Sequence, residues 1–469
     1  MAKLWATPAD RDRLAAAGSA VLLVGSYDGS GNYGDVLQLA GAIQTVRRAP
    51  GEPLPIAILE HETIAHHAKL LRRYPEIFAG AAFVHFDDGR GEAVDGLCEL
   101  ADGAAPDLTV LHLYGGGYLN RWWAGRKIEH CEAAHRLAAG RALQLTASGL
   151  QVAEDAIGPA GPAHELLASA SWIGLRDASS LEFVNRHLAA FGSPKAYLAG
   201  DDAIPFIASA DAVDPRGNVN FHLNLSGWIS EDAARLEARI VRFLCNLADA
   251  TDRPLKLQPV VAYEDPRISE RAELERFLDR HGDELEAHGV SAVAALDILD
   301  DAVRGGLGGF RSAQMTVSCS YHVTLTSLLA GIPAVLLSDN SYYDQKAAGL
   351  RDLFGIAPGL IGVRGSAEDA RTAAEALSDG PARAEVVAAV GRGRQDVVAR
   401  HEAAREMLLA AMSVGRERAA FDLGRRRALA RAEAAEARLA AVTDSRAWRW
   451  VTRMRRARDA VRRQADRVR

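Results

Sequence analysis

The chain has 469 residues, a hydrophobic fraction of 48% and a formal net charge of −6 at pH 7. That length exceeds a single hydrophobic core, and the composition excludes an intrinsically disordered chain. Residues 1–18 lack the apolar core of a signal peptide, and no run of about 18 apolar residues predicts a membrane span. The four cysteines are far apart and lack metal-ligand spacing, so we expect reduced thiols, no bound metal and a cytoplasmic location.

The first half of the chain alternates buried-strand patterns with helical patterns, which is typical of a parallel sheet covered on both faces. The predicted strands are Val21–Val24, Ile56–Leu59, Leu108–Leu113, Gln144–Ala147, Trp172–Leu175 and Tyr197–Leu198. A short, polar, turn-rich segment at residues 211–217 then indicates a change of domain. We therefore predict a Rossmann-like domain over residues 1–212.

A glycine-rich turn follows the first of these strands and leads into a helix predicted from Val36 to Arg47. Glycine permits positive φ and close approach of the backbone to a ligand, so Gly34 suits a binding turn. Asn32 and Asp35 can cap the helix or bind the hydroxyl groups of a sugar. The alternative is a turn that only connects a strand to a helix, as many glycine turns do.

The second half repeats the alternation of strands and helices. Its predicted strands are Val219–Leu223, Leu255–Pro259, Val290–Val293, Met315–Val317 and Ala334–Leu337. We therefore predict a second Rossmann-like domain over residues 213–412, with a cleft between the two sheets. Ligands of open α/β sheets lie beyond the carboxyl ends of the strands, so functional residues of both halves should line that cleft.

The polar turn after the fourth strand of the second half carries the strongest functional pattern. Ser318, Ser320 and His322 lie in this turn, just before a helix predicted from Val323 to Ala330. The free N–H groups and the positive dipole end of a helix start favour an anion. Lys346, beyond the next strand, can add a positive charge. The sequence thus predicts an anion site at which His322 is the candidate acid or base.

Residues 413–469 form a different kind of segment, almost free of Gly and Pro and rich in Ala, Arg and Glu, which predicts a helical tail. Its end, Asp444–Arg469, carries ten Arg and three Asp, a net charge of +7, so the remaining residues sum to −13. Apolar residues at helical spacing, with Trp448 and Trp450, favour an anionic membrane surface. A solvated basic helix and a coiled-coil segment are the alternatives. Nucleic acid is not expected, because no binding module is recognisable.

The polar turn and its surroundings resemble the C-terminal signature of the polysaccharide pyruvyl transferase family. In that signature Ser-x-Arg-x-His opens a helix, Gly-x-Pro follows, and a Lys lies shortly after the next strand. The matching residues here are Ser318, His322, Gly331, Pro333 and Lys346. The family resemblance implies two Rossmann-like domains arranged as in the GT-B glycosyltransferases.

Other segments match the family in the same order along the chain. Asn32, Gly34 and Asp35 fit its Asn-x-Gly-Asp motif. A strand that ends in a triple glycine, with Gly116 and Gly117, follows. The further matches are Ser148-Gly149, the strand with Arg176-Asp177 and Ser180, and Gly200-Asp201-Asp202. Separately, Ser445–Arg449 resembles the tails of many bacterial envelope glycosyltransferases.

One position departs from the signature, because Ser320 stands where the family has Arg. The resemblance implies that this Arg holds the phosphate or carboxylate of phosphoenolpyruvate, the family's donor. Arg311 or Arg176 is a candidate replacement. The implied reaction joins pyruvate to two hydroxyls of an acceptor sugar as a ketal, with His322 as acid or base and Lys346 as an anion contact.

Two other functions remain open at this point. A glycosyltransferase that uses a nucleotide sugar would share the fold and the helix-start anion site, and Ser320 makes it the main rival. A catalytically silent family member would keep the fold and bind neither donor. If the protein is a pyruvyl transferase, we expect no cofactor besides the donor substrate. We expect the acceptor to be a sugar or lipid-linked glycan of the cell envelope. We also expect the tail to contact the inner face of the membrane.

Overall fold

The computed structural model describes residues 3–49, 51–60, 63–87, 96–106, 108–120, 123–141, 143–188, 195–208, 217–225, 230, 232–251, 253–265, 268–356 and 359–443. The chain divides into two compact units, Met1–Gly415 and Arg416–Arg469. The predicted domain boundary after residue 212 and the basic segment Asp444–Arg469 lie outside the described residues. Within the described part, no helix is long and apolar enough to cross a membrane.

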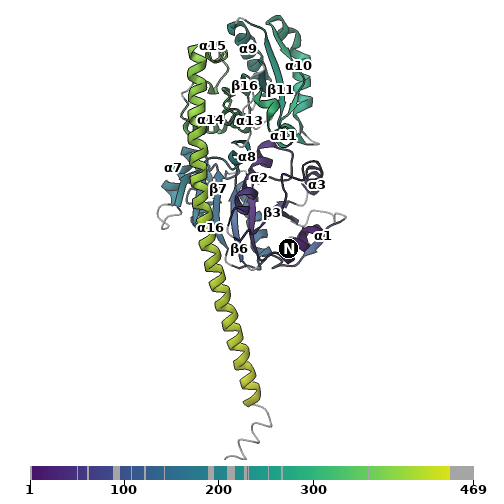
Figure 1. The fold of residues 1–469 in the computed structure, drawn as a ribbon, viewed down its shortest axis with the longest axis vertical. Coiled ribbons are helices and arrows are strands. Elements are labelled where there is room, and N and C mark those ends of the chain that lie inside the picture. Colours follow the sequence, from purple (N-terminus) through teal and green to yellow (C-terminus); the bar gives the residue numbers. More distant parts are fainter. Residues whose placement is uncertain are drawn as a thin grey trace, which may run out of the picture. The chain divides into compact units, whose positions relative to one another are not determined.

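The strands of the first half form one sheet (Figure 1). They are β1 (Lys3–Ala6), β2 (Ser19–Gly25), β3 (Leu54–Glu60), β4 (Ala82–Asp87), β5 (Cys98–Leu100), β6 (Leu108–Tyr114), β7 (Gln144–Leu150), β8 (Trp172–Leu175) and β9 (Lys195–Leu198). Their order in the sheet is β5-β1-β4-β3-β2-β6-β7-β8-β9. The strands from β4 to β9 are parallel, whereas β1 runs antiparallel to both of its neighbours.

Helices alternate with the strands of the first half. They are α1 (Pro8–Ala16), α2 (Tyr33–Arg47), α3 (Ile64–Arg73), α4 (Ala124–Leu137), α5 (Glu154–Ile157), α6 (His164–Ala168), α7 (Ala178–Leu188) and α8 (Ile204–Ala208). Of these helices, α2, α3, α4, α5, α6 and α7 lie in connections between the parallel strands. A crossover helix is what a parallel connection requires, because the chain must return to the same end of the sheet.

The second half builds a parallel sheet of its own. Its strands are β10 (Val219–His222), β11 (Leu255–Val261), β14 (Val290–Ala292), β15 (Leu296–Asp297), β16 (Met315–Ser318), β17 (Ala334–Leu337) and β18 (Ile361–Val363). The order is β14-β11-β10-β16-β17-β18, and β15 pairs with β11. A separate antiparallel pair joins β12 (Glu264–Asp265) to β13 (Ile268–Ser269).

Helices flank this second sheet and extend the chain beyond it (Figure 1). They are α9 (Ala233–Thr251), α10 (Glu270–Ala287), α11 (Ile298–Arg304), α12 (Gly308–Arg311), α13 (Tyr321–Leu329), α14 (Ser341–Phe354), α15 (Ala367–Leu377) and α16 (Pro381–Thr443). The course of α16 confirms the predicted helical character of the C-terminal region as far as Thr443.

Two parallel-sheet halves confirm the predicted α/β class, and a strand lies at each position where the sequence predicted one. Among the described residues, seven strands were not predicted: the two-residue strands β12, β13 and β15, and the longer strands β1, β4, β5 and β18. The strands β1, β5 and β18 have only three or four residues and lie at or next to a sheet edge, where the apolar pattern is short. A histidine and an aspartate interrupt the apolar run of β4.

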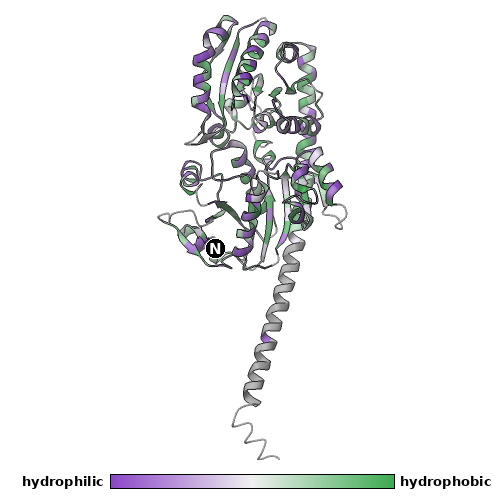
Figure 2. Ribbon diagram, turned by 180° about the vertical axis from the view of Figure 1, so that it is seen from behind, coloured by the Kyte–Doolittle hydropathy of each residue, from purple (hydrophilic) through white to green (hydrophobic). Residues whose placement is uncertain are grey.

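Apolar residues fill the interior of both halves, as the hydropathy view shows along the strands (Figure 2). One core cluster joins side chains of the two halves, including Tyr33 and Val36 from α2 and Leu325 from α13. The Tyr33 hydroxyl lies 3.0 Å from Thr326 Oγ1, and the Tyr33 N–H donates to the carbonyl of Ala262 at 2.9 Å. These contacts fix the start of α2 against α13.

Candidate functional site

The first turns of α2 and α13 meet where the glycine-rich turn and the polar turn were predicted to contribute to one site. Gly34 lies against the ring of His322, and a Cβ built on Gly34 would lie 1.8 Å from His322 Nδ1. Only a residue without a side chain therefore leaves space for this imidazole. The two motifs, nearly 300 residues apart in sequence, form one contact.

Three of the predicted site residues build the turns themselves. Asn32 is the N-cap of α2, and its side chain accepts hydrogen bonds from the N–H groups of Gly34 at 3.0 Å and Asp35 at 3.5 Å. Ser320 is the N-cap of α13 and accepts from the Val323 N–H at 3.5 Å. Ser318 Oγ accepts from the Ser320 N–H at 2.8 Å. These side chains hold the two helix starts in place.

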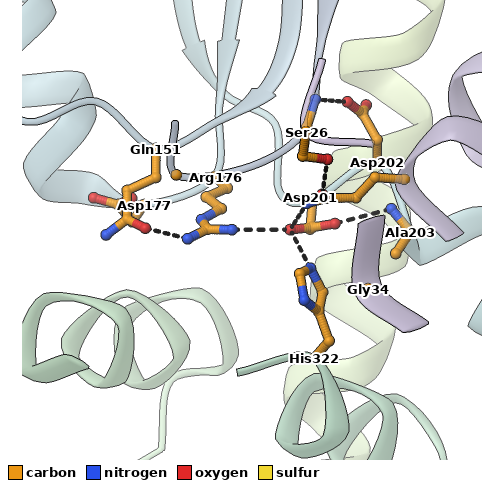
Figure 3. Close-up of polar contacts among 12 residues, drawn as sticks. Ser26, Gly34, Gln151, Arg176, Asp177, Asp201, Asp202, Ala203 and His322 are labelled. Atoms are coloured by element: carbon orange, nitrogen blue, oxygen red, sulfur yellow. Dashed lines mark hydrogen bonds and ion pairs between the residues drawn. The ribbon is translucent and has the colours of Figure 1, made fainter. Parts of the chain in front are cut away.

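Asp201, which the sequence placed in the family order without a role, is the centre of the polar cluster (Figure 3). Its Oδ2 accepts from Gln38 Nε2 at 2.9 Å and lies 3.4 Å from Arg176 Nη1. Oδ1 accepts from the Ala203 N–H at 2.9 Å. Nε2 of His322 lies 3.6 Å from Oδ2, which is long for a hydrogen bond but close enough for strong electrostatic coupling.

The charges in this cluster follow from burial and from these partners. The Asp201 side chain is 0% exposed, and that of His322 is 15% exposed. Although burial opposes it, the interactions with His322 and Arg176 and the Ala203 N–H lower the pKa of Asp201 to about 2. Burial lowers the pKa of His322, and Asp201 only partly offsets this effect. At neutral pH the cluster therefore holds a carboxylate beside a neutral imidazole.

Arg176 is fixed on several sides. Its Nη2 donates to Gln151 Oε1, its Nη1 pairs with Asp201, and its guanidinium lies 4.3 Å from the ring centre of Tyr321 (Figure 3). The Tyr321 ring also meets that of His322 edge to face at 5.0 Å between centroids. A rigid, desolvated guanidinium at this position is suited to hold a carboxylate or phosphate near His322.

The triple glycine lies beside the same cluster. A Cβ on Gly116 would lie 2.6 Å from Ser26 Cβ, and one on Gly117 would lie 2.6 Å from the Tyr342 hydroxyl. The Gly115 N–H donates to Asp202 Oδ2 at 2.7 Å. Asp202 also accepts from Ser148 at 2.6 Å, while burial raises its pKa to about 7. This second aspartate is part of the buried support beneath the site.

Asp35 follows Gly34 in the first turn of α2. Burial and the neighbouring charge of Asp28 raise the pKa of Asp35 to about 7, against the opposing effects of a hydrogen bond from Ser26 and of the charges of Lys127 and Lys346. A carboxylate with a pKa near neutrality can accept a proton from a substrate hydroxyl. Lys127 is a buried cation that sequence reasoning missed, because it belongs to an otherwise ordinary helix.

Lys346 lies over the rings of Tyr342 and Tyr343, with its Nζ 4.1 Å and 4.5 Å from their centroids. The charge of Lys346 lowers the pKa of His322 and of Asp35, which places its ammonium within electrostatic range of both. Burial also lowers the pKa of Lys346 itself. The predicted anion contact thus belongs to the same cluster.

Arg311 takes a different position from the rest of the predicted site. It is a buried residue of α12, in the segment that leads into the amino end of β16. Ser318, Ser320 and His322 follow the carboxyl end of that strand. Of the two arginines considered as replacements for the family's Arg, the geometry places Arg176 next to His322.

Two further features bear on the chemistry. In the part of the chain that the structure describes, no group of three or more His, Cys, Asp or Glu side chains is arranged to hold a metal ion. Cys319, between Ser318 and Ser320, is fully buried, and burial raises the pKa of its thiol to about 12. A thiol in that state is a packing residue rather than a nucleophile.

Residues 161–341 match the polysaccharide pyruvyl transferase family model. The matched segment contains Arg176, Asp201 and His322, whereas the turn at Asn32 and the residue Lys346 lie outside it. The family resemblance predicted from the sequence is therefore confirmed for this segment. No curated protein matches the chain in sequence.

Solved structures resemble the chain at low sequence identity. A Listeria monocytogenes protein assigned as a UDP-N-acetylglucosamine 2-epimerase has a TM-score of 0.50 and 13% identity, covering 86% of this chain and 98% of its own. The sucrose-phosphate synthase of Thermosynechococcus elongatus has a TM-score of 0.45 and 12% identity, covering 83% and 97%. The first comparison supports a GT-B-like fold, as predicted. The family match and this fold together indicate a transferase.

Proposed function

We propose that this protein transfers the pyruvyl group of phosphoenolpyruvate to two hydroxyls of a sugar in an envelope or exopolysaccharide glycan. One observation carries the proposal: His322, Asp201 and Arg176 form a buried cluster at the start of α13, inside the segment that matches the pyruvyl transferase model. The cluster offers a cation, a proton carrier and a group that orients it, as this reaction requires.

The proposed reaction is a balanced addition and elimination at the enol carbon. His322 gives a proton to the methylene carbon, and an acceptor hydroxyl adds to the neighbouring carbon that bears phosphate. The carbon–oxygen bond to phosphate then breaks, and a second hydroxyl adds to the same carbon. One of the two hydroxyl protons replaces the proton that His322 gave to the new methyl group. The other leaves with inorganic phosphate.

Donor binding favours the protonated form of His322, which takes its proton from solvent. The imidazole is neutral in the empty site because burial lowers its pKa. The phosphate and carboxylate of the donor would bring negative charge to the start of α13 and raise the pKa of His322 again. Asp201 stays ionised and stabilises the resulting imidazolium. Protonation is thus coupled to the presence of the donor.

Asp35 is the proposed base on the acceptor side. It lies one residue from Gly34, which contacts His322, and its pKa of about 7 lets it take a proton from an attacking hydroxyl. Lys127 and Lys346 help to keep the carboxylate charged. Acid and base therefore come from the starts of two different helices, α13 and α2.

The test is calorimetry with phosphoenolpyruvate, followed by measurement of phosphate release with sugar acceptors. Saturable donor binding that His322→Ala leaves largely intact, with phosphate release that this variant loses, would support the assignment. Because Ser320 stands where the family has Arg, a glycosyltransferase that uses a nucleotide sugar is the main alternative. A panel of nucleotide sugars therefore belongs in the same experiment. Binding of a nucleotide sugar without binding of phosphoenolpyruvate would replace the proposal by a glycosyltransferase, and binding of neither would indicate a silent member.

We further propose that the basic segment Asp444–Arg469 holds the enzyme at the cytoplasmic face of the membrane, where a lipid-linked acceptor would be presented. Each Lys or Arg near an anionic surface contributes about 1 kcal/mol, so a net charge of +7 gives reversible binding. Deletion of this segment should release the protein from anionic vesicles while activity on a soluble acceptor survives. Equal vesicle binding by both forms at low salt would contradict this role.

A further inference from the structure

A cavity opens at the carboxyl edge of the second sheet, and His322 is not among the described residues that line it. Its volume is about 1050 Å³. The described residues that line it are Ser230, Asp232, Arg235, Arg239, Arg242, Asn246, Asp339, Asn340, Arg364, Gly365, Ser366 and Ala367. They come from α9 and the residues before it, from the β17–α14 turn and from the β18–α15 turn. We call this cavity the arginine pocket.

Two of its four arginines are anchored by the chain. Arg239 pairs with Asp339 at 2.6 Å and donates to the carbonyl of Ser338 at 3.3 Å. Arg364 donates to the same carbonyl at 2.9 Å and pairs with Asp344 at 2.7 Å. The β17–α14 turn thus fixes both guanidinium groups at the pocket wall.

The other two arginines are held less firmly, although Arg242 Nε donates to the carbonyl of Ala238 at 3.3 Å. Arg235 and Arg242 are exposed on α9, and neither forms an ion pair with a residue that the structure describes. Four arginines against Asp232 and Asp339 give the lining a formal charge of +2, in a chain whose net charge is −6. A local excess of positive charge with exposed guanidinium groups that form no ion pair with a described residue favours a multiply charged anion.

We propose that the arginine pocket binds the phosphate or diphosphate group of a phosphorylated carbohydrate. The volume is comparable to that of cavities for whole small-molecule ligands and exceeds the needs of a bare phosphate. The remaining lining side chains offer amide, hydroxyl and carboxylate groups such as Asn246, Asn340 and Ser230, which suit sugar hydroxyls. No aromatic side chain is among the described lining residues, so a nucleobase would find no stacking surface there.

The pocket is separate from the His322 cluster but close to it along the chain. Asn340 lines the pocket and caps α14, the helix that carries Lys346 towards His322. Six residues of helix rise about 9 Å. A ligand with its phosphate in the pocket could therefore extend its sugar towards the donor site. The proposal itself does not depend on which donor His322 serves.

The experiment measures binding of glucose 1-phosphate and inorganic diphosphate by calorimetry to the full chain, with glucose as the uncharged comparison. Arg235→Ala should weaken both phosphorylated probes about tenfold or more, because it removes a charged hydrogen-bond donor. Arg276→Ala is the matched control, since Arg276 is an exposed arginine of α10 outside the pocket lining. Thermal melts of both variants verify that the fold is kept.

His322→Ala separates this site from the proposed donor site. The proposal expects that variant to bind both phosphorylated probes like the wild type, whatever becomes of phosphoenolpyruvate. Loss of probe binding in His322→Ala would place the probes in the His322 cluster and overturn the proposal. Equal effects of Arg235→Ala and Arg276→Ala, absence of saturable binding, or equal binding of glucose would overturn it as well. Failure of phosphoenolpyruvate to bind would affect only the proposed function.

Discussion

The His322 cluster and the arginine pocket are both suited to anions, but they are built in opposite ways. In the cluster, Arg176 is 2% exposed and is held between Asp201, Gln151 and Tyr321. In the pocket, Arg235 and Arg242 are exposed and have no ion-pair partner among the described residues. One region is rigid and desolvated, and the other is open and solvated.

This difference suits the His322 cluster to catalysis and the arginine pocket to ligand binding. A buried, preorganised cluster can shift pKa values and stabilise a developing charge, because its groups need no reorganisation during the reaction. An open arginine surface keeps the pKa values of its ligands near those in water and mainly supplies attraction. We therefore expect substitutions in the cluster to act on turnover and substitutions in the pocket to act on affinity.

The largest effect is expected from Gly34→Ala. The added Cβ would lie 1.8 Å from His322 Nδ1, so the imidazole must leave its position. Loss of a positioned acid or base lowers turnover by roughly 10²- to 10⁴-fold. Steady-state phosphate release should show a similar loss for Gly34→Ala and His322→Ala.

Gly125→Ala provides the control for that substitution. Gly125 also lies in the first turn of a helix, α4, and a Cβ there would meet no atom within 4 Å. Turnover should stay at the wild-type level in Gly125→Ala. Wild-type turnover in Gly34→Ala would show that the packing of His322 against α2 has no part in the reaction.

Asp35→Asn tests the acceptor side through its pH dependence. The pKa of Asp35 is raised from 3.8 to about 7, so the carboxylate form grows as pH rises through 7. At saturating phosphoenolpyruvate, where the donor keeps His322 protonated, the kcat of the wild type should increase about tenfold per pH unit below 7 and level off above it. Asp35→Asn should remove this rise and leave a lower, flatter profile.

Asp202→Asn is the matched comparison, because the pKa of Asp202 is also raised to about 7. Asp202 accepts from the Gly115 N–H and from Ser148, in the buried support beneath the site. Its replacement should change thermal stability yet keep the rise of kcat through pH 7 at saturating phosphoenolpyruvate. If Asp202→Asn rather than Asp35→Asn abolished the rise, the base would be Asp202 and the assignment of Asp35 would be wrong.

Ser320→Arg is expected to have a smaller effect. It restores the residue that the family signature has at this position and should improve half-saturation by phosphoenolpyruvate by about tenfold, the lower end of the value of one charged hydrogen bond. It also removes the N-cap hydrogen bond that the Ser320 hydroxyl accepts from the Val323 N–H, which costs about 0.5–2 kcal/mol in stability. Ser320→Ala separates the two effects, since it loses the cap and adds no charge. Unchanged half-saturation in Ser320→Arg would indicate that Arg176 already fills that role.

The sequence predicted the alternation of elements and the two turns, because strand and helix periods and glycine positions are local signals. It did not predict the position of Asp201 between Arg176 and His322, which depends on three segments meeting in space. The arginine pocket was not predicted for the same reason, because its arginines come from two separate segments, α9 and the turn after β18. Gln38 and Lys127 belong to ordinary helical patterns, and only the folded arrangement shows what they contact.

The smallest expected effect, and the one that sharpens the comparison most directly, is that of salt. The Debye length falls from about 10 Å at 0.1 M to about 3 Å at 1 M ionic strength, and exposed charges are screened far more than buried ones. Inorganic diphosphate in the arginine pocket should therefore lose affinity severalfold over this range. Half-saturation by phosphoenolpyruvate should change less, because Arg176 and Asp201 are shielded from solvent. The comparison would fail if both ligands weakened in parallel, since the two regions would then be equally open to solvent.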